Sequence, residues 1–295
     1  MITIFTPTYN RGYILPKLYD SLKRQSSTDF EWIIVDDGSI DETEKVVSEW
    51  QREKNAFNIT FAKQENAGKH IAINKGVSLA KGEWFFIVDS DDYIVDNAVE
   101  NINQWVLDCN CDKFAGVAGT KITNSNSTIG GEVAFKTPFV DCKNNERERY
   151  GLGGDKAEVY KTSILRKYPF PQFVGEKFLS ECAVWDHIAI DGLKIRWFNS
   201  PLMICNYLPD GLTAKVKRLE LDNFQGYTYT TNIRLKAYSG VEHYRIIGQY
   251  INKSRHKGLL LTKIANNINQ PLLLIFLMNI AVTLKNKFSG DRVLG

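Results

Sequence analysis

The chain has 295 residues, 43% hydrophobic and 24% charged, and this composition excludes a globally disordered chain. Lys and Arg number 37 against 34 Asp and Glu, so the net charge of +3 argues against a dedicated nucleic-acid-binding protein. Five cysteines without a repeated Cys-x-x-Cys spacing indicate neither a disulfide scaffold nor a zinc site.

The N-terminal part of the chain alternates between short apolar runs and helical patterns. Apolar runs predict four strands, at residues 2–6, 32–35, 58–62 and 84–88. Apolar residues three or four apart predict the intervening helices, at residues 13–23, after a cap at Ser39 or Asp41, at 69–80 and at 96–108. Buried strands separated by helices predict an α/β fold with a mostly parallel, doubly wound sheet.

A polar cluster follows each of these four strands. The clusters occupy residues 7–11, 36–39, 66–70 and 89–92. Doubly wound sheets bind ligands beyond the carboxyl ends of their strands. We therefore expect the four clusters to converge at one edge of the sheet.

The pattern is mixed after about residue 113. Further strands are predicted at residues 114–121, 131–136, 195–198 and 202–207. Helices are predicted at residues 159–166 and 181–190. From residue 214 the chain is helical, with breaks near residues 239–240, 258 and 271. We therefore divide it into a catalytic domain at 1–213 and a helical C-terminal region at 214–295.

Two acidic turns follow buried strands. Asp89, Asp91 and Asp92 can point together at one hard cation, with phosphate oxygens completing its shell. Asp36 or Asp37 can accept hydrogen bonds from a base or a ribose. Each turn, taken alone, is also typical of a solvated helix cap. No Gly-x-Gly-x-x-Gly or P-loop motif follows either strand, which disfavours dinucleotide and P-loop nucleotide binding.

Four motifs in order resemble those of the family 2 inverting glycosyltransferases with a GT-A fold. They are Phe5-Thr6-Pro7-Thr8-Tyr9-Asn10-Arg11, Val35-Asp36-Asp37-Gly38-Ser39, Glu65-Asn66-Ala67-Gly68-Lys69 and Val88-Asp89-Ser90-Asp91-Asp92. The resemblance covers about residues 1 to 110 closely and fades towards residue 210. It implies a Rossmann-like GT-A domain and metal-dependent, inverting transfer from a nucleotide sugar, with uridine as the family-weighted base. It also implies a glycan or lipid-linked acceptor in the synthesis of a bacterial surface polysaccharide such as capsule.

The resemblance also implies a role for each motif residue. Those expected to line the nucleotide site are Thr6, Pro7, Tyr9, Arg11, Asp36, Asp37, Gly68, Lys69 and Ser90. Asp89 would contact the ribose or the sugar and share the metal with Asp91, which would coordinate Mg²⁺ or Mn²⁺ at the diphosphate. Lys69, at the start of a predicted helix, is also typical of a solvated surface residue.

Inverting transfer needs a general base facing the acceptor hydroxyl. The family often has Glu-Asp where this chain has Glu181 and Cys182, and a thiol is a poor substitute for a carboxylate. We therefore expect Glu181 to be the base, with Asp155 and Asp186 as alternatives. Glu181 is equally well placed to be a simple helix cap.

The C-terminal region concentrates positive charge. Residues 214–295 carry 13 Lys or Arg against 4 Asp or Glu, while residues 1–213 carry 24 against 30. Such a region can dock on anionic lipid, or pack as an ordinary helical subdomain on the catalytic domain or on a second subunit. Its longest apolar run, residues 271–282, is shorter than the roughly 20 residues that span a bilayer. The N-terminus has no secretory signal, so we expect a cytoplasmic enzyme, peripheral at the inner face of the plasma membrane.

Two other functions remain open at the level of sequence. A nucleotidyltransferase also uses paired carboxylates and a metal, although a Gly-rich phosphate loop is missing after the first strand. The chain also fits a non-catalytic carbohydrate- or lipid-binding partner of a synthase. Release of nucleoside diphosphate from a nucleotide sugar would discriminate between these functions.

Overall fold

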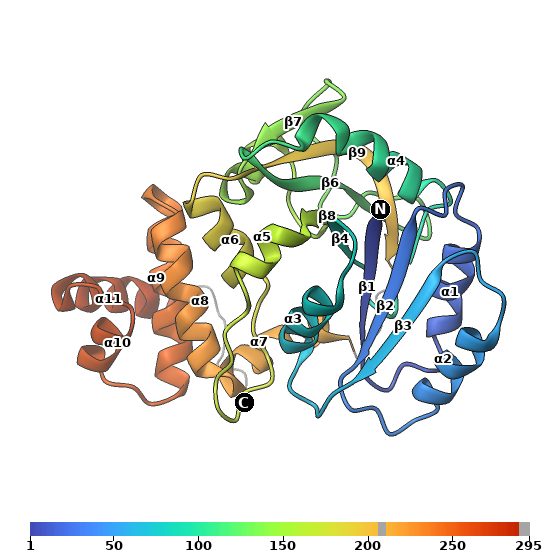
Figure 1. Cartoon of the computed structure of the whole chain (residues 1–295). Coiled ribbons are helices and arrows are strands. Elements are labelled where there is room, and N and C mark those ends of the chain that lie inside the picture. The colour runs from blue at the N-terminus through green and yellow to red at the C-terminus, as the bar shows by residue number, and fades with distance from the viewer. Residues whose placement is uncertain (206–210, 289–295) are drawn as a thin grey trace.

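Four parallel strands form one half of a mixed sheet (Figure 1). The computed structural model describes residues 1–205 and 211–288. β1 (Ile2–Thr8) lies between β2 (Phe30–Asp36) and β4 (Trp84–Ile87), and β3 (Asn58–Lys63) pairs with the far side of β2. The register aligns Thr8 with Asp36 and Asp36 with Lys63, so these strands end in one row. The predicted convergence of the polar clusters at one edge is confirmed.

Helices cover both faces of this sheet. One face packs against α1 (Leu15–Lys23), α2 (Thr43–Arg52) and α4 (Ala98–Trp105). The other packs against α3 (Lys69–Leu79), α5 (Thr162–Lys167) and α6 (Cys182–Ile190). Alternation along β1 explains the two cores, because Ile2 and Ile4 point into the first and Phe5 into the second. The predicted α/β, doubly wound architecture is confirmed.

The second half of the sheet is mixed. Its order continues from β4 through β8 (Lys156–Lys161), β6 (Phe114–Thr123) and β9 (Lys194–Cys205) to β5 (Tyr93–Ile94). β8 is antiparallel to both β4 and β6, whereas β9 is parallel to β6. The short strand β7 (Phe139–Cys142) pairs with β9. Short 3₁₀ helices occur at Leu107–Cys109 and Asn144–Tyr150.

Three predictions in this half differ from the structure. Residues 131–136 are not a strand, because the turn at Gly130 and Gly131, both at positive φ, leads into irregular chain before β7. The helix predicted at 159–166 is wrong over its first half, since β8 runs to Lys161 and α5 begins at Thr162. Such a short buried apolar run lacks a diagnostic period. The strands predicted at 195–198 and 202–207 are one strand, β9, and residues 206–207 lie outside the described residues.

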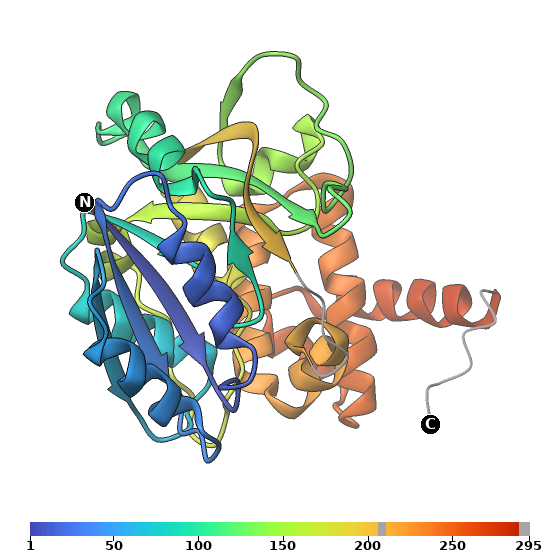
Figure 2. The same cartoon turned by 90° about the vertical axis from the view of Figure 1, so that its right-hand side faces the viewer.

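Helices make up the described part of the chain after residue 211. They are α7 (Leu212–Asp222), α8 (Phe224–Ala237), α9 (Gly240–His256), α10 (Leu261–Asn267) and α11 (Leu272–Phe288). The boundaries between α8 and α11 coincide with the predicted breaks. α8 packs on α6, and α9 to α11 share a third core, so the region extends outward from the sheet (Figures 1 and 2).

We find no single helix in the described ranges that is long and apolar enough to cross a membrane. One bent pair, Leu261–Asn267 with Leu272–Asn286, meets the length and composition criteria together, across a bend of 115°.

Candidate active site

The loops after β1 and β2 are locked together. Asn10, in the left-handed region at φ 54°, donates its backbone N–H to Ser39 Oγ at 2.8 Å. Its side-chain oxygen accepts from the backbone N–H of Ile40 at 2.9 Å. An asparagine tolerates this backbone conformation better than most residues. The two motif loops therefore form one rigid unit at the sheet edge.

Asp36 and Asp37 have different environments. Asp36 is fully buried, and its Oδ1 accepts from the backbone and hydroxyl of Ser39 at 2.9 and 2.5 Å. Its Oδ2 has no hydrogen-bond partner among the described residues, and Lys63 Nζ lies 3.9 Å away. Asp37 accepts three hydrogen bonds of 2.8 Å, from the Gln64 side chain and from two backbone N–H groups, those of Ala67 and Gly68. Asp37 thus holds the third motif loop, while Asp36 keeps an unused acceptor.

Gly68 allows the third motif loop to touch the segment that carries Glu181. It has φ 97°, and a Cβ built there would lie 1.9 Å from the carbonyl oxygen of Lys177. No side chain fits in that space. The glycine of this motif therefore permits backbone contact between the start of α3 and the segment leading into α6.

Lys69 joins two of the predicted motif residues. Its Nζ lies 2.7 Å from Asp89 Oδ1 and 2.8 Å from Glu181 Oε1, although the three residues come from α3, the loop after β4 and the start of α6. Burial alone would lower the pKa of Lys69, but the two carboxylates raise it well above its usual range. Lys69 is therefore a charged residue at the centre of the site.

The turn Asp89–Asp92 carries opposing pKa shifts. Burial opposes the charge of Asp89, but Lys69 and Lys121 overcome it and lower the pKa of this carboxyl. Burial, and then the charge of Asp89, raises the pKa of Asp91, while the Arg11 guanidinium acts in the other direction. Asp92 is buried and receives a hydrogen bond from Cys205 Sγ at 3.2 Å, and burial raises its pKa to about 6. Within this turn Asp89 and Asp91 are half-buried whereas Asp92 is buried, and both carboxylate oxygens of Asp89 contact Lys69.

The carboxylates of Asp89 and Asp91 fit a divalent cation whose remaining ligands come from outside the protein. The described residues contain no group of three His, Cys, Asp or Glu side chains arranged to hold a metal ion by themselves. Asp91 and Asp89 are close enough for the charge of one to disfavour ionisation of the other, and a cation would relieve that repulsion. Carboxylate oxygens suit Mg²⁺ or Mn²⁺, which usually completes its shell with substrate phosphates.

The three candidate bases occupy different positions. Glu181 has a one-third exposed side chain (34%) beside Lys69. Asp155 is exposed, and its charge acts on Lys121 in the same cluster. Asp186 is only 1% exposed and accepts from Asn144 Nδ2 at 2.7 Å, between α6 and the C-terminal helices. Glu181 is therefore the candidate best placed to meet a substrate at Lys69 and Asp89.

The thiol of Cys182 cannot act as a base in place of the aspartate that the family often has at this position. Burial, followed by the nearby charge of Asp186, raises the pKa of its thiol, so the sulfur stays protonated at neutral pH.

Sequence analysis missed Glu158 and Lys121. Burial raises the pKa of Glu158 to about 7, opposed by Arg147 and Lys121, while the charges of Glu181 and Asp155 raise it further. The available signal was the alternation of Lys156 and Glu158 along one face of β8, which the erroneous helix at 159–166 obscured.

The remaining motif residues are divided between the core and the surface. Thr6 is fully buried and its Oγ1 accepts from Trp32 Nε1 at 3.0 Å, so its hydroxyl is already occupied. Pro7 is buried in β1, and Ser90 is buried in the acidic turn. Tyr9 is 47% exposed just beyond the strand end, where a planar ligand has access to its ring.

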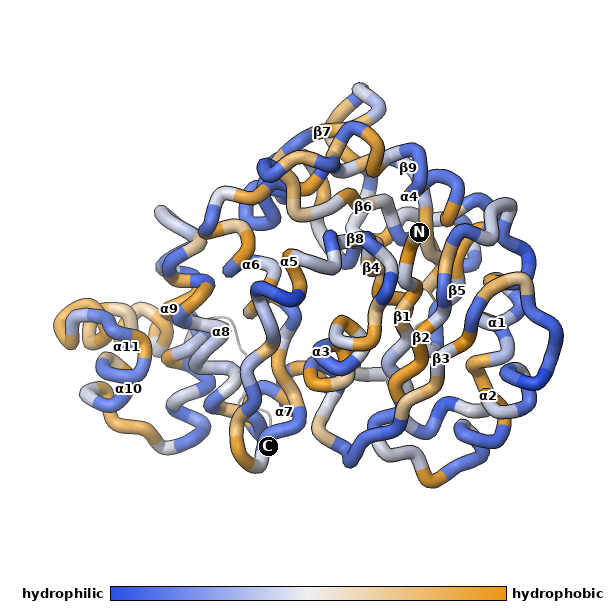
Figure 3. The backbone as a smooth tube through the Cα atoms, viewed as in Figure 1, coloured by the Kyte–Doolittle hydropathy of each residue, from blue (hydrophilic) through white to orange (hydrophobic). Residues whose placement is uncertain are grey.

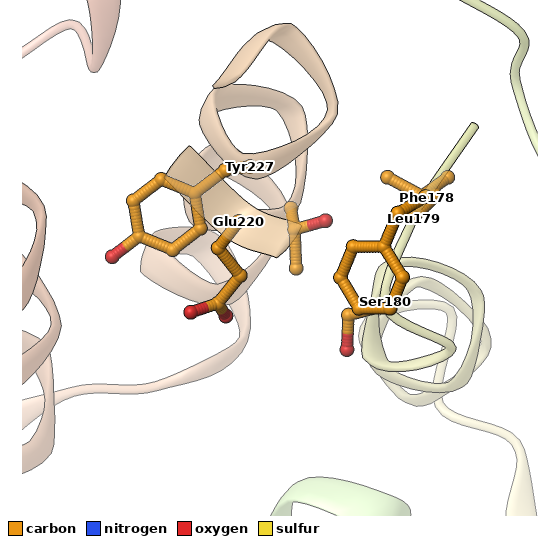
Figure 4. Close-up of a pocket in the computed structure, with 6 residues that line it drawn as sticks. Phe178, Leu179, Ser180, Glu220 and Tyr227 are labelled. Atoms are coloured by element: carbon orange, nitrogen blue, oxygen red, sulfur yellow. The ribbon is translucent and has the colours of Figure 1, made fainter. Parts of the chain in front are cut away.

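A small cavity lies between the segment that precedes Glu181 and the C-terminal helices. Its walls include Phe178 and Ser180 on one side and Glu220 and Tyr227 on the other (Figure 4). Its volume of about 10 Å³ holds at most one water molecule. The helical region is thus packed closely behind the segment that carries Glu181.

The sequence of the N-terminal part of the chain matches a known family. The profile of "Glycosyl transferase family 2" matches residues 3–167. A Campylobacter jejuni protein named GalNAc(5)-diNAcBac-PP-undecaprenol beta-1,3-glucosyltransferase is 24% identical over 184 residues, which are 62% of this chain and 58% of that protein. The chain thus spans less than two thirds of the length of the curated relatives that it matches.

Two solved structures share the fold. Staphylococcus aureus TarS 1–349 in complex with UDP-GlcNAc superposes with a TM-score of 0.61 at 17% identity, covering 99% of this chain and 93% of that one. The mannosyltransferase PcManGT from Pyrobaculum calidifontis, in complex with GDP-Man and Mn²⁺, gives 0.55 at 17% identity, covering 99% and 76%.

Proposed function

Because the chain belongs to glycosyl transferase family 2, we propose that it transfers a sugar from a nucleotide sugar to a glycan or lipid-linked acceptor, inverting the anomeric centre. The observation that carries this proposal is the bridge from Asp89 through Lys69 to Glu181. Through the positive charge of Lys69, this bridge joins Asp89, which we place on the donor side, to Glu181, which we place on the acceptor side. We assign the reaction to residues 1–213 and to a cytoplasmic pathway for surface polysaccharide.

On the donor side, we propose that the nucleotide lies over the ends of β1 and β2. Tyr9 offers an exposed ring, and Asp36 Oδ2 is an acceptor without a partner in the described residues. A UDP-sugar is our first candidate, and the UDP-GlcNAc complex of the structurally similar TarS supports testing it first.

We propose that Asp91, with Asp89, holds Mg²⁺ or Mn²⁺ together with the diphosphate of the donor. When bound, such a cation stabilises the negative charge that develops on the leaving diphosphate. The Mn²⁺ in the PcManGT complex supports this choice of metal. Lys69 adds a fixed positive charge beside the same carboxylates.

On the acceptor side, we propose that Glu181 is the general base. The acceptor hydroxyl oxygen forms its bond to the anomeric carbon while the bond from that carbon to the diphosphate breaks, and the hydroxyl proton passes to Glu181. Lys69 contacts Glu181 Oε1 at 2.8 Å and so holds this side chain towards the donor. Direct displacement of this kind inverts the sugar.

The test is an incubation of the full chain with a panel of UDP-, GDP- and other nucleotide sugars and Mn²⁺, with and without EDTA. We expect metal-dependent release of nucleoside diphosphate with at least one donor. Release of pyrophosphate from a sugar phosphate and a nucleoside triphosphate would support the nucleotidyltransferase function instead. No turnover of any donor, together with tight glycan binding, would support a non-catalytic partner of a synthase.

A further inference from the structure

Helix α11 presents an apolar stripe to solvent. Six large apolar side chains follow each other along one side of it and are between 44% and 70% exposed: Leu272, Leu273, Phe276, Leu277, Ile280 and Leu284. Figure 3 shows hydrophobic residues along α11, and Figure 2 shows the helix extending away from its neighbours. A contiguous apolar patch of this kind marks a surface that binds a partner or a lipid.

The exposed stripe is not the face with which α11 packs on the protein. Ile275 is fully buried in the third core, where Leu274 and Met278 accompany it against α9 and α10. Helical geometry puts Ile275 on the side opposite Ile280 and Leu273. The helix is thus apolar on two sides, and the protein covers only one of them.

The sequence around the stripe is basic, although two of its cations are paired with acids from flanking positions, Arg245 with Glu242 and Lys253 with Glu220. Residues 243–290 contain seven Lys or Arg (Arg245, Lys253, Arg255, Lys257, Lys263, Lys285 and Lys287) and no Asp or Glu. Lys263 in α10 and Lys285 in α11 have exposed side chains. Apolar side chains next to exposed cations suit the surface of an anionic bilayer, where the apolar side chains enter the acyl boundary and the cations contact headgroups.

We propose that α11, with the cations of α9 and α10, is a docking surface for an anionic lipid bilayer. A second copy of the chain fits this surface less well, because a symmetric contact would bring two sets of cations together. A transmembrane arrangement fits less well too. The 17 residues of α11 extend about 26 Å, less than the roughly 30 Å of the hydrocarbon core, and one side of the helix is already buried.

Docking would orient the active site relative to the membrane. Glu181 precedes α6, α6 packs on α8, α8 on α9, and α9 on α11, so the stripe and the site belong to one continuous body. The inference depends on α9 to α11 alone and stands whether or not the proposed reaction is correct.

The test is co-sedimentation of the full chain with vesicles of phosphatidylcholine alone, and of phosphatidylcholine mixed with phosphatidylglycerol, without any nucleotide sugar. We expect binding to the anionic vesicles and a loss of at least tenfold in partition coefficient at about 0.5 M NaCl, where charges are screened within a few Å. Donor turnover measured separately without vesicles keeps failure of docking distinct from failure of the proposed reaction.

Two sets of variants locate the surface. The triple variant L273Q/L277Q/I280Q should lower the partition coefficient by at least tenfold, because it removes apolar contacts with the bilayer. K263Q/K285Q should lower it by about fivefold for each cation removed. K17Q/K54Q removes two exposed lysines from the catalytic domain and should leave binding unchanged. Circular dichroism and thermal melts verify folding, and the lysine variants keep the test decisive if the triple variant is unstable.

Three outcomes would overturn the proposal. One is absence of binding to anionic vesicles, with a dimer in light scattering that the triple variant dissociates, which assigns the stripe to a second copy. Another is equal, salt-insensitive binding to both vesicle types that resists alkaline carbonate, which indicates insertion. The third is a loss of vesicle binding in K17Q/K54Q as great as that in K263Q/K285Q. It would show that binding depends on the net charge of the protein and not on the surface formed by α10 and α11.

Discussion

At the scale of single residues, Lys69 organises the site through two carboxylates. A lysine that starts a helix is usually solvated, but here only 24% of its side chain is exposed and it contacts Asp89 and Glu181. An unpaired buried charge is costly, so each carboxylate depends on the lysine and the lysine on both. The site is therefore preorganised in its charges before any substrate binds.

Asp91 can be removed without loss of the fold. Burial and Asp89 raise its pKa, which means that its charge is disfavoured in the free protein. We expect D91A to abolish metal-dependent donor turnover while the melting temperature stays the same or rises slightly. Isothermal titration with UDP and Mn²⁺, compared with UDP alone, would show whether the metal contribution has gone. Undiminished turnover at saturating donor would refute the metal assignment.

Glu181 is predicted to act in the chemical step. We expect E181Q to lower kcat by roughly 10³-fold, in the range measured for general bases, with little change in KM for the donor. D155N tests the exposed alternative and should keep most of the activity. D186N should affect stability more than kcat, because Asp186 is buried against Asn144 and Arg234. A loss in D155N or D186N that exceeds the loss in E181Q would move the assignment of the base.

At the scale of elements, the contact between residue 68 and the segment before α6 assembles the two sides of the site. Asp37 holds the loop before α3 through two backbone N–H groups, and Gly68 in that loop meets the backbone at Lys177. The loop before α3 and the segment that leads to Glu181 are therefore fixed against each other by backbone contacts, which side-chain periodicity does not reveal.

Gly68 is predicted to be irreplaceable. G68A puts a Cβ within 1.9 Å of the Lys177 carbonyl oxygen at φ 97°, so we expect a loss of more than about 2 kcal/mol in the free energy of unfolding. G175A is the matched control, since Gly175 also has a positive φ of 79° but no atom lies within 4 Å of its Cβ. It should cost about 1 kcal/mol. Equal losses in urea titrations of both variants would contradict the steric argument.

At the scale of the whole molecule, two buried groups make the fold sensitive to acid. Burial lowers the pKa of His70 to about 4, opposed by Asp37, and the side chain lies edge-on to Phe170. The unfolded chain binds a proton at this histidine below its ordinary pKa of about 6.5, whereas the folded chain stays neutral. Asp89, with its lowered pKa, adds stability at neutral pH that is lost as the pH falls.

The contribution of His70 to stability should therefore decrease from neutral pH towards pH 4, whereas Asp92 and Glu158, whose pKa values burial raises to about 6 and about 7, act in the opposite direction. His70 alone is expected to remove about 2 kcal/mol by pH 5. H70Q should remove this loss, so that its free energy of unfolding gains about 2 kcal/mol relative to wild type between pH 7 and pH 5, measured by urea titration at several pH values, whatever its effect on stability at pH 7. H256Q, which changes an exposed histidine, should keep the wild-type slope. An unchanged slope in H70Q would show that His70 is protonated in the folded protein.

The sequence predicted the parallel half of the fold well and the mixed half poorly. β1 to β4 and their helices have strong periodicity, and each ends in a turn rich in Asp, Asn or Gly. Part of β8 was predicted as helix and β7 was not predicted, because short runs in a mixed sheet are decided by pairing with distant strands, such as β8 with β4 and β6. The residues of a short run carry no pattern that shows which distant strand the run will pair with.

The sequence by itself determined the family resemblance, the α/β class and the edge at which polar loops gather, because strand ends and motif spacings are local properties. Only the tertiary structure decided which motif residues act together. The contacts of Lys69 with Asp89 and Glu181, the burial of Asp186, and the exposure of one side of α11 depend on how separate elements pack. These features depend on distances between side chains from different elements, and such distances exist only once the sheet and its helices have assembled.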